Sequence, residues 1–84
     1  MKEIEVGKVT HYFPKIGVAV IKVTGSSIKV GDQLHIKGNA SDFMQEITSM
    51  QIEHEKIQVA EPGQSVGLKV DAPVRANDSV YKEV

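Results

Sequence analysis

The pattern of hydrophobic and polar residues between positions 17 and 36 predicts two β-strands joined by a polar turn. Residues 18–23 contain one polar side chain, that of Lys22, so both faces are apolar, as in the centre of a small closed sheet. Residues 28–37 alternate between apolar and polar, which is typical of a strand with one buried face. Gly31 and Asp32 interrupt this alternation, and we expect a tight turn there because glycine readily adopts a positive φ.

Three further segments carry β patterns. Residues 3–13 begin as a strand whose parity switches at Gly7, which predicts a bulge or a bend. Residues 65–71 alternate cleanly, and residues 80–84 complete the sheet. Pro62-Gly63 occupies the two central positions of a type II turn, so a turn should precede the strand at 65–71.

Two of the predicted turns share one form. Gly31 precedes Asp32, and Asn77 precedes Asp78, before the chain re-enters a strand. Glycine and asparagine both tolerate a positive φ. In each turn we expect the aspartate carboxylate to accept hydrogen bonds from backbone amides of the turn.

The segment 43–57 fits two structures. Asp42 and Gln45 are spaced as a helix capping box, and helical spacing also relates Phe43, Ile47, Met50, His54 and Ile57. Against a helix, β-branched residues recur here, and residues 44–52 keep a period of two over most of their length. The pattern alone favours a strand and leaves an amphipathic helix as the competitor.

Short strands with turn signals every 8–12 residues, without a clear helix, predict an all-β fold. We expect residues 1–84 to form a single domain, a closed or nearly closed six-stranded antiparallel barrel of Greek-key type. Closure would leave so short a chain without exposed sheet edges. Residues 37–42 lack a pattern and are expected to form a surface loop.

Composition narrows the possible functions. The 84 residues include no cysteine, which excludes disulfide scaffolds and thiolate chemistry and fits a reducing cytoplasm. The formal net charge of −1 gives no general attraction to nucleic acid. No apolar run is long enough for a membrane span, and the first residues lack the apolar centre of a signal peptide. We therefore expect a soluble cytoplasmic protein that does not bind membranes.

Catalytic chemistry is not indicated. The sequence has no nucleophile elbow, phosphate-binding loop or spaced set of metal ligands, so we expect no enzymatic activity, no cofactor and no bound nucleotide or metal. A metal site made by His11, His35 and His54 with Glu53 or Glu55 is a remote competitor. No pair of histidines has the spacing of a preformed site, so each is better explained as a surface residue.

The ring side chains of His11, Tyr12 and Phe13 are consecutive and cannot all enter one face of a strand. At least one ring should therefore be exposed, between the charges of Lys8 and Lys15. Such a cluster is suited to stacking on a base or to packing against a partner. The alternative is that Phe13 and one neighbour close an end of the barrel.

Three stretches together resemble domain 2 of translational GTPases such as elongation factor Tu. They are GVAV at 17–20, IKVGDQLHI at 28–36 and AEPGQSVGL at 60–68. The resemblance covers nearly the whole chain and implies the six-stranded barrel of that domain. It implies no GTPase activity, because these residues include no GTP-binding domain.

A closer resemblance is carried by THYFPK at 10–15, SDFMQ at 41–45 and SMQIEH at 49–54. These stretches are similar to short translation elongation factor-like proteins and to the C-terminal barrel of some collagenase-like peptidase family members. The resemblance implies that residues 43–54 form strand.

In elongation factor Tu, the domain 2 face that receives the aminoacyl end of tRNA is built from the first strand and the strand before the A-x-x-G turn. The resemblance places His11, Phe13, Gln51 and His54 on the matching face. With the rest of the ring cluster they complete a candidate binding surface that consists of His11, Tyr12, Phe13, Lys15, Phe43, Gln51 and His54.

The expected function is that of a non-catalytic, translation-factor-like binding module. Its partner would be an RNA, such as tRNA or ribosome-related RNA, or a protein. The alternative is a stand-alone accessory subunit for an enzyme of the collagenase-like peptidase type.

Overall fold

The computed structural model describes residues 2–38 and 41–84, and in them every regular element is a β-strand. The all-β prediction is therefore confirmed for the described residues. The strands are β1 (Glu3–Phe13), β2 (Val18–Val23), β3 (Ile28–Lys29), β4 (Gln33–Lys37), β5 (Asp42–Glu46), β6 (Met50–Ile52), β7 (Glu55–Ile57), β8 (Val59–Ala60), β9 (Ser65–Lys69) and β10 (Ser79–Glu83).

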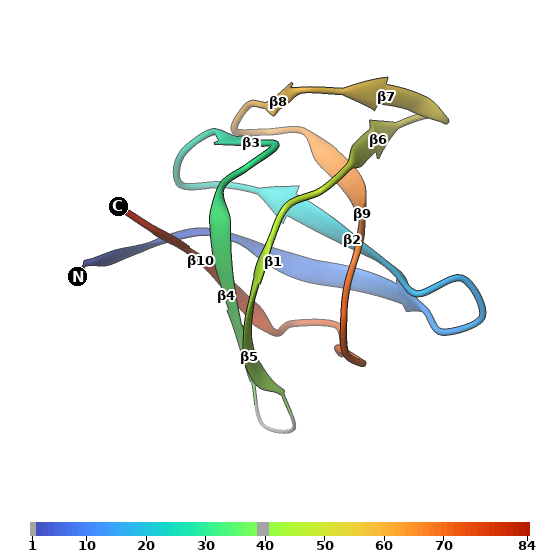
Figure 1. Cartoon of the computed structure of the whole chain (residues 1–84), viewed down its shortest axis with the longest axis horizontal. Coiled ribbons are helices and arrows are strands. Elements are labelled where there is room, and N and C mark those ends of the chain that lie inside the picture. The colour runs from blue at the N-terminus through green and yellow to red at the C-terminus, as the bar shows by residue number, and fades with distance from the viewer. Residues whose placement is uncertain (1, 39–40) are drawn as a thin grey trace.

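Eight of these strands form one antiparallel sheet in the order β5-β4-β10-β1-β2-β9-β6-β7, while β3 and β8 pair separately. The sheet curls around the core, and the β3–β8 pair lies beside the β6–β7 hairpin at the top of Figure 1. The two chain ends lie side by side, and the Val84 amide donates to the Lys2 carbonyl oxygen (2.9 Å).

The prediction of a closed six-stranded barrel is wrong, because the sheet is open and its edges are β5 and β7. The edge strand β5 pairs with β4 and the edge strand β7 pairs with β6, and no ladder among the described residues joins β5 to β7. Strands expected to be whole are also divided at residues 30–32 and 47–49. There the Gly31 amide donates to the Ile47 carbonyl oxygen, and the Ile47 amide donates to the Asp32 carbonyl oxygen (both 2.9 Å), so the β4–β5 pairing continues irregularly beyond the strand ends.

The competition between strand and helix over residues 43–57 is decided for strand by β5, β6 and β7. The strand prediction fails at residues 47–49, which separate β5 from β6, and at two further residues, Glu53 and His54. These two residues form the turn between β6 and β7 and have positive φ angles of 50° and 69°. The expected loop at 37–42 is shorter, since Lys37 ends β4 and Asp42 begins β5; positions 39 and 40 lie outside the described residues.

Strand β1 bends twice. The pairing with β10 shifts register between Glu5 and Gly7, which confirms the predicted bulge near Gly7. A second shift, between Val9 and His11 in the pairing with β2, was not predicted. It leaves Val9 buried in the core and directs His11 outward, because an extra residue reverses the parity of a strand.

One hydrophobic core fills the interior of the curled sheet. The buried faces predicted for residues 28–36 and 65–71 are confirmed, and residues 18–23, predicted to be apolar on both faces, bury Ala19, Ile21 and Val23. Tyr12 and Phe43 are partly buried and pack against this core. Its buried members are Val6, Val9, Ala19, Ile21, Val23, Ile28, Leu34, Ile36, Ile47, Met50, Ala60, Val66, Leu68, Val70, Val74 and Val80.

The predicted aspartate turns are confirmed. In the first, Asp32 Oδ2 accepts from the Lys29 amide (2.9 Å), and Gly31 has φ 98°. In the second, Asp78 Oδ2 accepts from the Arg75 amide (2.9 Å), and the preceding Asn77 has φ 77°. The side chain thus satisfies a backbone donor that the strand ends leave free.

The turn at residues 61–64 has the same form. Gln64 Oε1 accepts from the Glu61 amide (2.8 Å), and the Gln64 amide donates to the Glu61 carbonyl oxygen (3.1 Å). Gly63 has φ 96° at the position where the sequence predicts the third residue of a type II turn.

Gln45 joins the edge strand β5 to the far end of β9. Its Nε2 donates to the Lys69 carbonyl oxygen, and its Oε1 accepts from the Asp71 amide, both at 2.8 Å. The side chain is almost fully buried, at 5 % exposure. One amide therefore supplies the donor and the acceptor that a neighbouring strand would supply, and it holds the open sheet in its curled form.

Replacing Gln45 by alanine should lower the free energy of unfolding by about 1–3 kcal/mol, because two partly buried backbone groups lose their partner. Urea denaturation of the wild type and the variant measures the change. Gln33→Ala, at an exposed position on the adjacent strand β4, is the matched control and should change stability by less than about 0.5 kcal/mol. Equal losses in both variants would show that the Gln45 bridge contributes nothing specific.

Candidate functional site

The strand register places a set of outward side chains in rows across β1, β2, β9, β6 and β7. One row runs His11, Val20, Gly67, Gln51 and Lys56, each paired with the next across neighbouring strands. Because side chains alternate between faces and Ala19, Val66 and Met50 point into the core, this row faces outward.

Parallel rows extend the same face. Phe13 pairs with Val18 and Val18 with Lys69, while Lys8 pairs with Lys22 and Lys22 with Ser65. We call this surface the basic face and define it by its outward residues, which are Lys8, His11, Phe13, Val18, Val20, Lys22, Gln51, Lys56, Ser65, Gly67 and Lys69.

Charge is divided between the two halves of the sheet. Strands β2, β6 and β9 contain no acidic residue at all. In β7 the acid Glu55 is adjacent to Lys56 and therefore has the opposite parity. Strands β1, β4, β5 and β10 instead carry an acidic face, defined by Glu3, Glu5, Asp42, Glu46 and Glu83. The net charge of −1 therefore hides a basic surface that contains four lysines.

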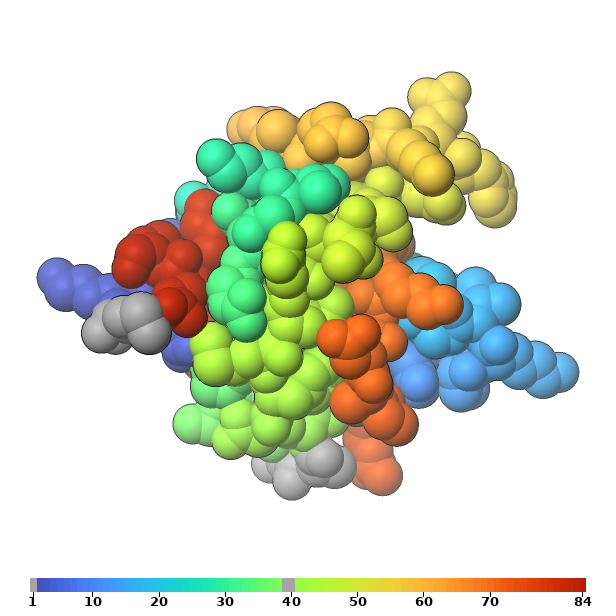
Figure 2. Space-filling model, in the orientation of Figure 1, coloured from blue at the N-terminus to red at the C-terminus, as the bar shows by residue number. Residues whose placement is uncertain are grey.

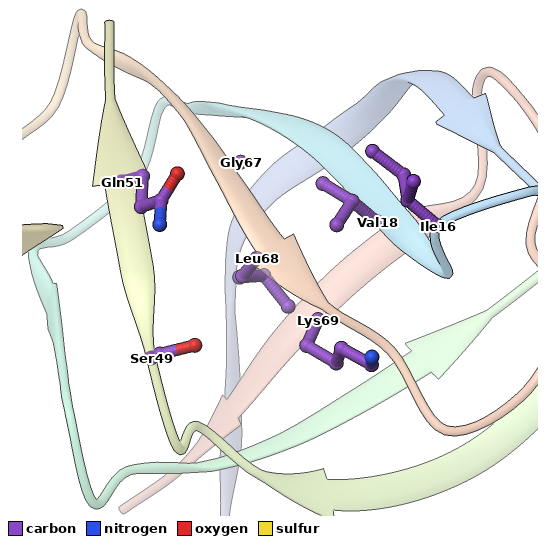
Figure 3. A pocket seen from close by; sticks show the side chains of 7 residues that line it. All are labelled: Ile16, Val18, Ser49, Gln51, Gly67, Leu68 and Lys69. Carbon is purple, nitrogen blue, oxygen red and sulfur yellow. The ribbon is translucent and has the colours of Figure 1, made fainter. Parts of the chain in front are cut away.

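A groove crosses the basic face. It has a volume of about 210 Å³ and lies over β9. Figure 3 shows Ser49 and Gln51 on one side of β9, and Val18 and Ile16 on the other. In the space-filling view, the surface is hollowed between the β6–β7 hairpin and the turn that joins β1 to β2 (Figure 2). Its lining residues are Ile16, Val18, Ser49, Gln51, Gly67, Leu68 and Lys69.

Gly67 keeps the centre of the groove open. A Cβ atom at this position would lie 3.4 Å from a Val18 methyl carbon and 3.9 Å from the Gln51 carbonyl oxygen. The row between Val20 and Gln51 therefore lacks a side chain at its middle position. At the β1–β2 turn, Ile16 and Phe13 are 61 % and 47 % exposed and form an apolar rim.

The structure brings together three of the residues predicted to form a binding surface. His11 and Phe13 are exposed and stack on one another, with ring centroids 6.2 Å apart, and Gln51 lines the groove. The sequence predicts at least one exposed ring between Lys8 and Lys15, and the structure has two, those of His11 and Phe13. Lys15 is exposed in the turn between β1 and β2.

The other three predicted surface residues lie elsewhere. Tyr12 and Phe43 pack against the core, and His54 is exposed at the tip of the β6–β7 turn. The surface residues that the sequence did not reveal are Ile16, Gly67, Lys56 and Lys69. Their shared face depends on which strands are neighbours, and the pattern within each strand carries no signal of that.

A second cluster, on the acidic face, was also missed. His35 on β4 lies between two carboxylates, with Nδ1 2.9 Å from Glu3 Oε2 and Nε2 2.5 Å from Asp42 Oδ1. The hydrogen bond to Asp42, assisted by Glu3 and opposed by burial, raises the pKa of His35 above its ordinary value of 6.5. The same hydrogen bond lowers the pKa of Asp42 below its ordinary 3.8. The cluster ties β1, β4 and β5 together.

Within residues 2–38 and 41–84, no three His, Asp or Glu side chains are arranged so that they can hold a metal ion. The same residues include no helix that could span a lipid bilayer.

No protein-family model matches the chain. The chain is 36 % identical over 81 residues to an uncharacterized protease of Methanocaldococcus jannaschii, a match that covers 95 % of the chain and 20 % of that protein. It is 28 % identical over 82 residues to a collagenase of Porphyromonas gingivalis, covering 96 % of the chain and 20 % of the collagenase. The chain thus spans about a fifth of the length of the curated relatives it matches.

The structure is similar to a crystal structure of the C-terminal domain of a candidate U32 peptidase from Geobacillus thermoleovorans. The TM-score is 0.87 at 27 % identity, and the match covers 94 % of this chain and 91 % of that domain. The selenomethionine variant of the same domain gives 0.86 at 25 % identity. The predicted similarity to collagenase-like peptidases is confirmed, whereas these relatives do not support a translation factor or an RNA partner.

The His35 cluster predicts a pH-dependent part of stability. Because the folded-state pKa of His35 is raised, its contribution is present below the ordinary pKa of histidine and is lost as the pH rises through the raised pKa. It also declines in strong acid, when the pH falls through the lowered pKa of Asp42.

Urea denaturation of the wild type and His35→Gln across this pH range should show the largest stability difference in weak acid. The difference should shrink toward alkaline pH. The exposed His11, replaced in the same way, is the control and should lack this dependence. A His35→Gln difference that stays constant with pH would contradict the ion-pair account.

Proposed function

We propose that this chain is a non-catalytic accessory module of a U32-type peptidase, and that it contacts the rest of the enzyme or its substrate through the basic face. The observation that carries the proposal is the match with an isolated C-terminal domain over nearly the full length of both chains. The chain therefore matches most of a domain that was crystallised by itself, and about a fifth of each larger relative.

The groove supports a role in binding. Its lining residues include neither a carboxylate nor a histidine, so they offer no general acid or base of the common kinds. Its volume of about 210 Å³ is also below the roughly 300–1,000 Å³ of small-molecule sites. A shallow groove with an exposed apolar rim is better suited to side chains of another polypeptide.

The relatives bear differently on the other functional expectations drawn from the sequence. The relatives named above do not support a translation-factor function, because they are described as proteases, collagenases and a U32 peptidase domain. A cytoplasmic location stays a prediction. The binding role of His11, Phe13 and Gln51 also stays a prediction, and these three residues belong to the basic face.

Affinity purification of the tagged chain from its native host tests the proposal. We expect it to recover a U32-type peptidase as the main partner, identified by mass spectrometry, with little nucleic acid in the eluate. The control is Ile16→Asp with Phe13→Asp, which places charge on the apolar rim and should reduce recovery of the peptidase. Recovery of RNA and ribosomal proteins without a peptidase would refute the proposal.

A further inference from the structure

We propose that the basic face binds an extended acidic protein segment in which apolar side chains are interspersed. This inference rests on the proposed function, since it names the chemistry of the partner at the same groove. Two properties of the basic face support it: its charged residues are all lysines, and an apolar groove crosses it.

The lysines supply the charge complementarity. Lys56 and Lys69 flank the groove from β7 and β9, and among the described residues neither forms an ion pair with a carboxylate. Lys22 donates to the Gly63 carbonyl oxygen (2.9 Å), so it is anchored and its charge is fixed beside Ser65. The nearest acids along β9, Glu61 and Asp71, lie in the connections before and after that strand. Glu55 adjoins Lys56 but has the opposite parity on β7, so the charges that belong to the basic face itself are all positive.

The groove supplies the apolar contact. Gly67 leaves the middle of the row empty, so an apolar side chain of the partner can rest against β9 between Val18 and Gln51. Ile16 then covers this side chain from the β1–β2 turn, where its own side chain is 61 % exposed. In an extended segment, side chains two positions apart face the same side, so an acidic residue at position i and an apolar residue at i+2 can contact the lysines and the groove together.

Single-stranded RNA fits this surface less well. Base stacking needs free aromatic faces, and the two exposed rings, His11 and Phe13, stack on each other, so each ring keeps only its outer face for a base. The third ring of the predicted cluster, Tyr12, packs against the core. The groove itself is lined by aliphatic side chains and backbone, which favour packing against aliphatic side chains over stacking on bases.

Fluorescence anisotropy with a dye-labelled glutamate–valine peptide, in which Glu-Ser-Val-Ser is repeated so that glutamate and valine share one side when extended, tests the inference at neutral pH and low salt. Lys56→Glu combined with Lys69→Glu should weaken binding by about tenfold or more, because two attractions become repulsions. Lys2→Glu combined with Lys37→Glu makes the same change in net charge away from the basic face and should change affinity by less than about twofold. Equal losses in both double variants would overturn the inference.

The groove is tested separately by Gly67→Val, which fills it without a change in charge. Binding of the glutamate–valine peptide should fall by about tenfold, while the weaker binding of polyglutamate should stay unchanged. Ile16→Ser, at a highly exposed position, should act in the same direction and does not depend on tolerance of a larger side chain in β9. Circular dichroism checks that both variants fold.

Two further outcomes would overturn the inference. One is tighter binding of polyuridine than of the acidic peptide, and the other is self-association of the chain through the lysines in sedimentation equilibrium. The test is independent of the purification described above. A chain that recovers the peptidase but does not bind the acidic peptide refutes this inference alone, whereas a chain that binds the peptide but recovers no peptidase refutes only the proposed function.

Discussion

The curled form of the sheet depends on one buried amide, that of Gln45. The backbone ladder is open between β5 and β7, so the sheet has two edges that hydrogen bonds within the ladder do not join. Gln45 ties the edge strand β5 to the end of β9 and to the connection after it, with one donated and one accepted hydrogen bond to backbone groups. Ser41 adds a second tie by donating to the Pro73 carbonyl oxygen (3.0 Å). Side-chain hydrogen bonds thus join parts of the fold that the backbone ladder leaves unconnected.

The curled sheet also brings lysines and the groove onto the same part of the surface. The two halves of the outer surface differ in charge: Lys22, Lys56 and Lys69 lie on β2, β7 and β9, whereas Glu3, Glu5, Asp42, Glu46 and Glu83 lie on β1, β5 and β10. The outer half that carries the lysines also contains Gly67, whose missing side chain opens the groove. A net charge near zero is therefore compatible with a strongly polarised surface, and total charge alone is a poor guide to the partner of so small a domain.

Much of the local structure followed from short-range chemistry. The turns at Asp32, Asp78 and Gly63 were predictable because their residues carry the positive φ and the side-chain acceptor that those turns require. The inward sets of β2 and β9 were predictable because strand periodicity is two. The pattern of residues 43–57 was ambiguous because Gln45 fits a helix cap as well as a strand, and its real partners lie on β9 and the connection after it, 24 and 26 residues away.

The all-β character, the main turns, much of the buried core and the likeness to collagenase-like peptidases could be predicted from the residues alone. These features depend on the periodicity and turn chemistry of segments a few residues long. Three further features follow from the three-dimensional arrangement: the sheet stays open, Tyr12 turns inward between two exposed rings, and His11, Gln51, Lys56 and Lys69 share a face. Those features depend on strand order and on a bulge at Thr10 that reverses parity within β1. The hydrophobic pattern within one strand does not indicate which strands become its neighbours.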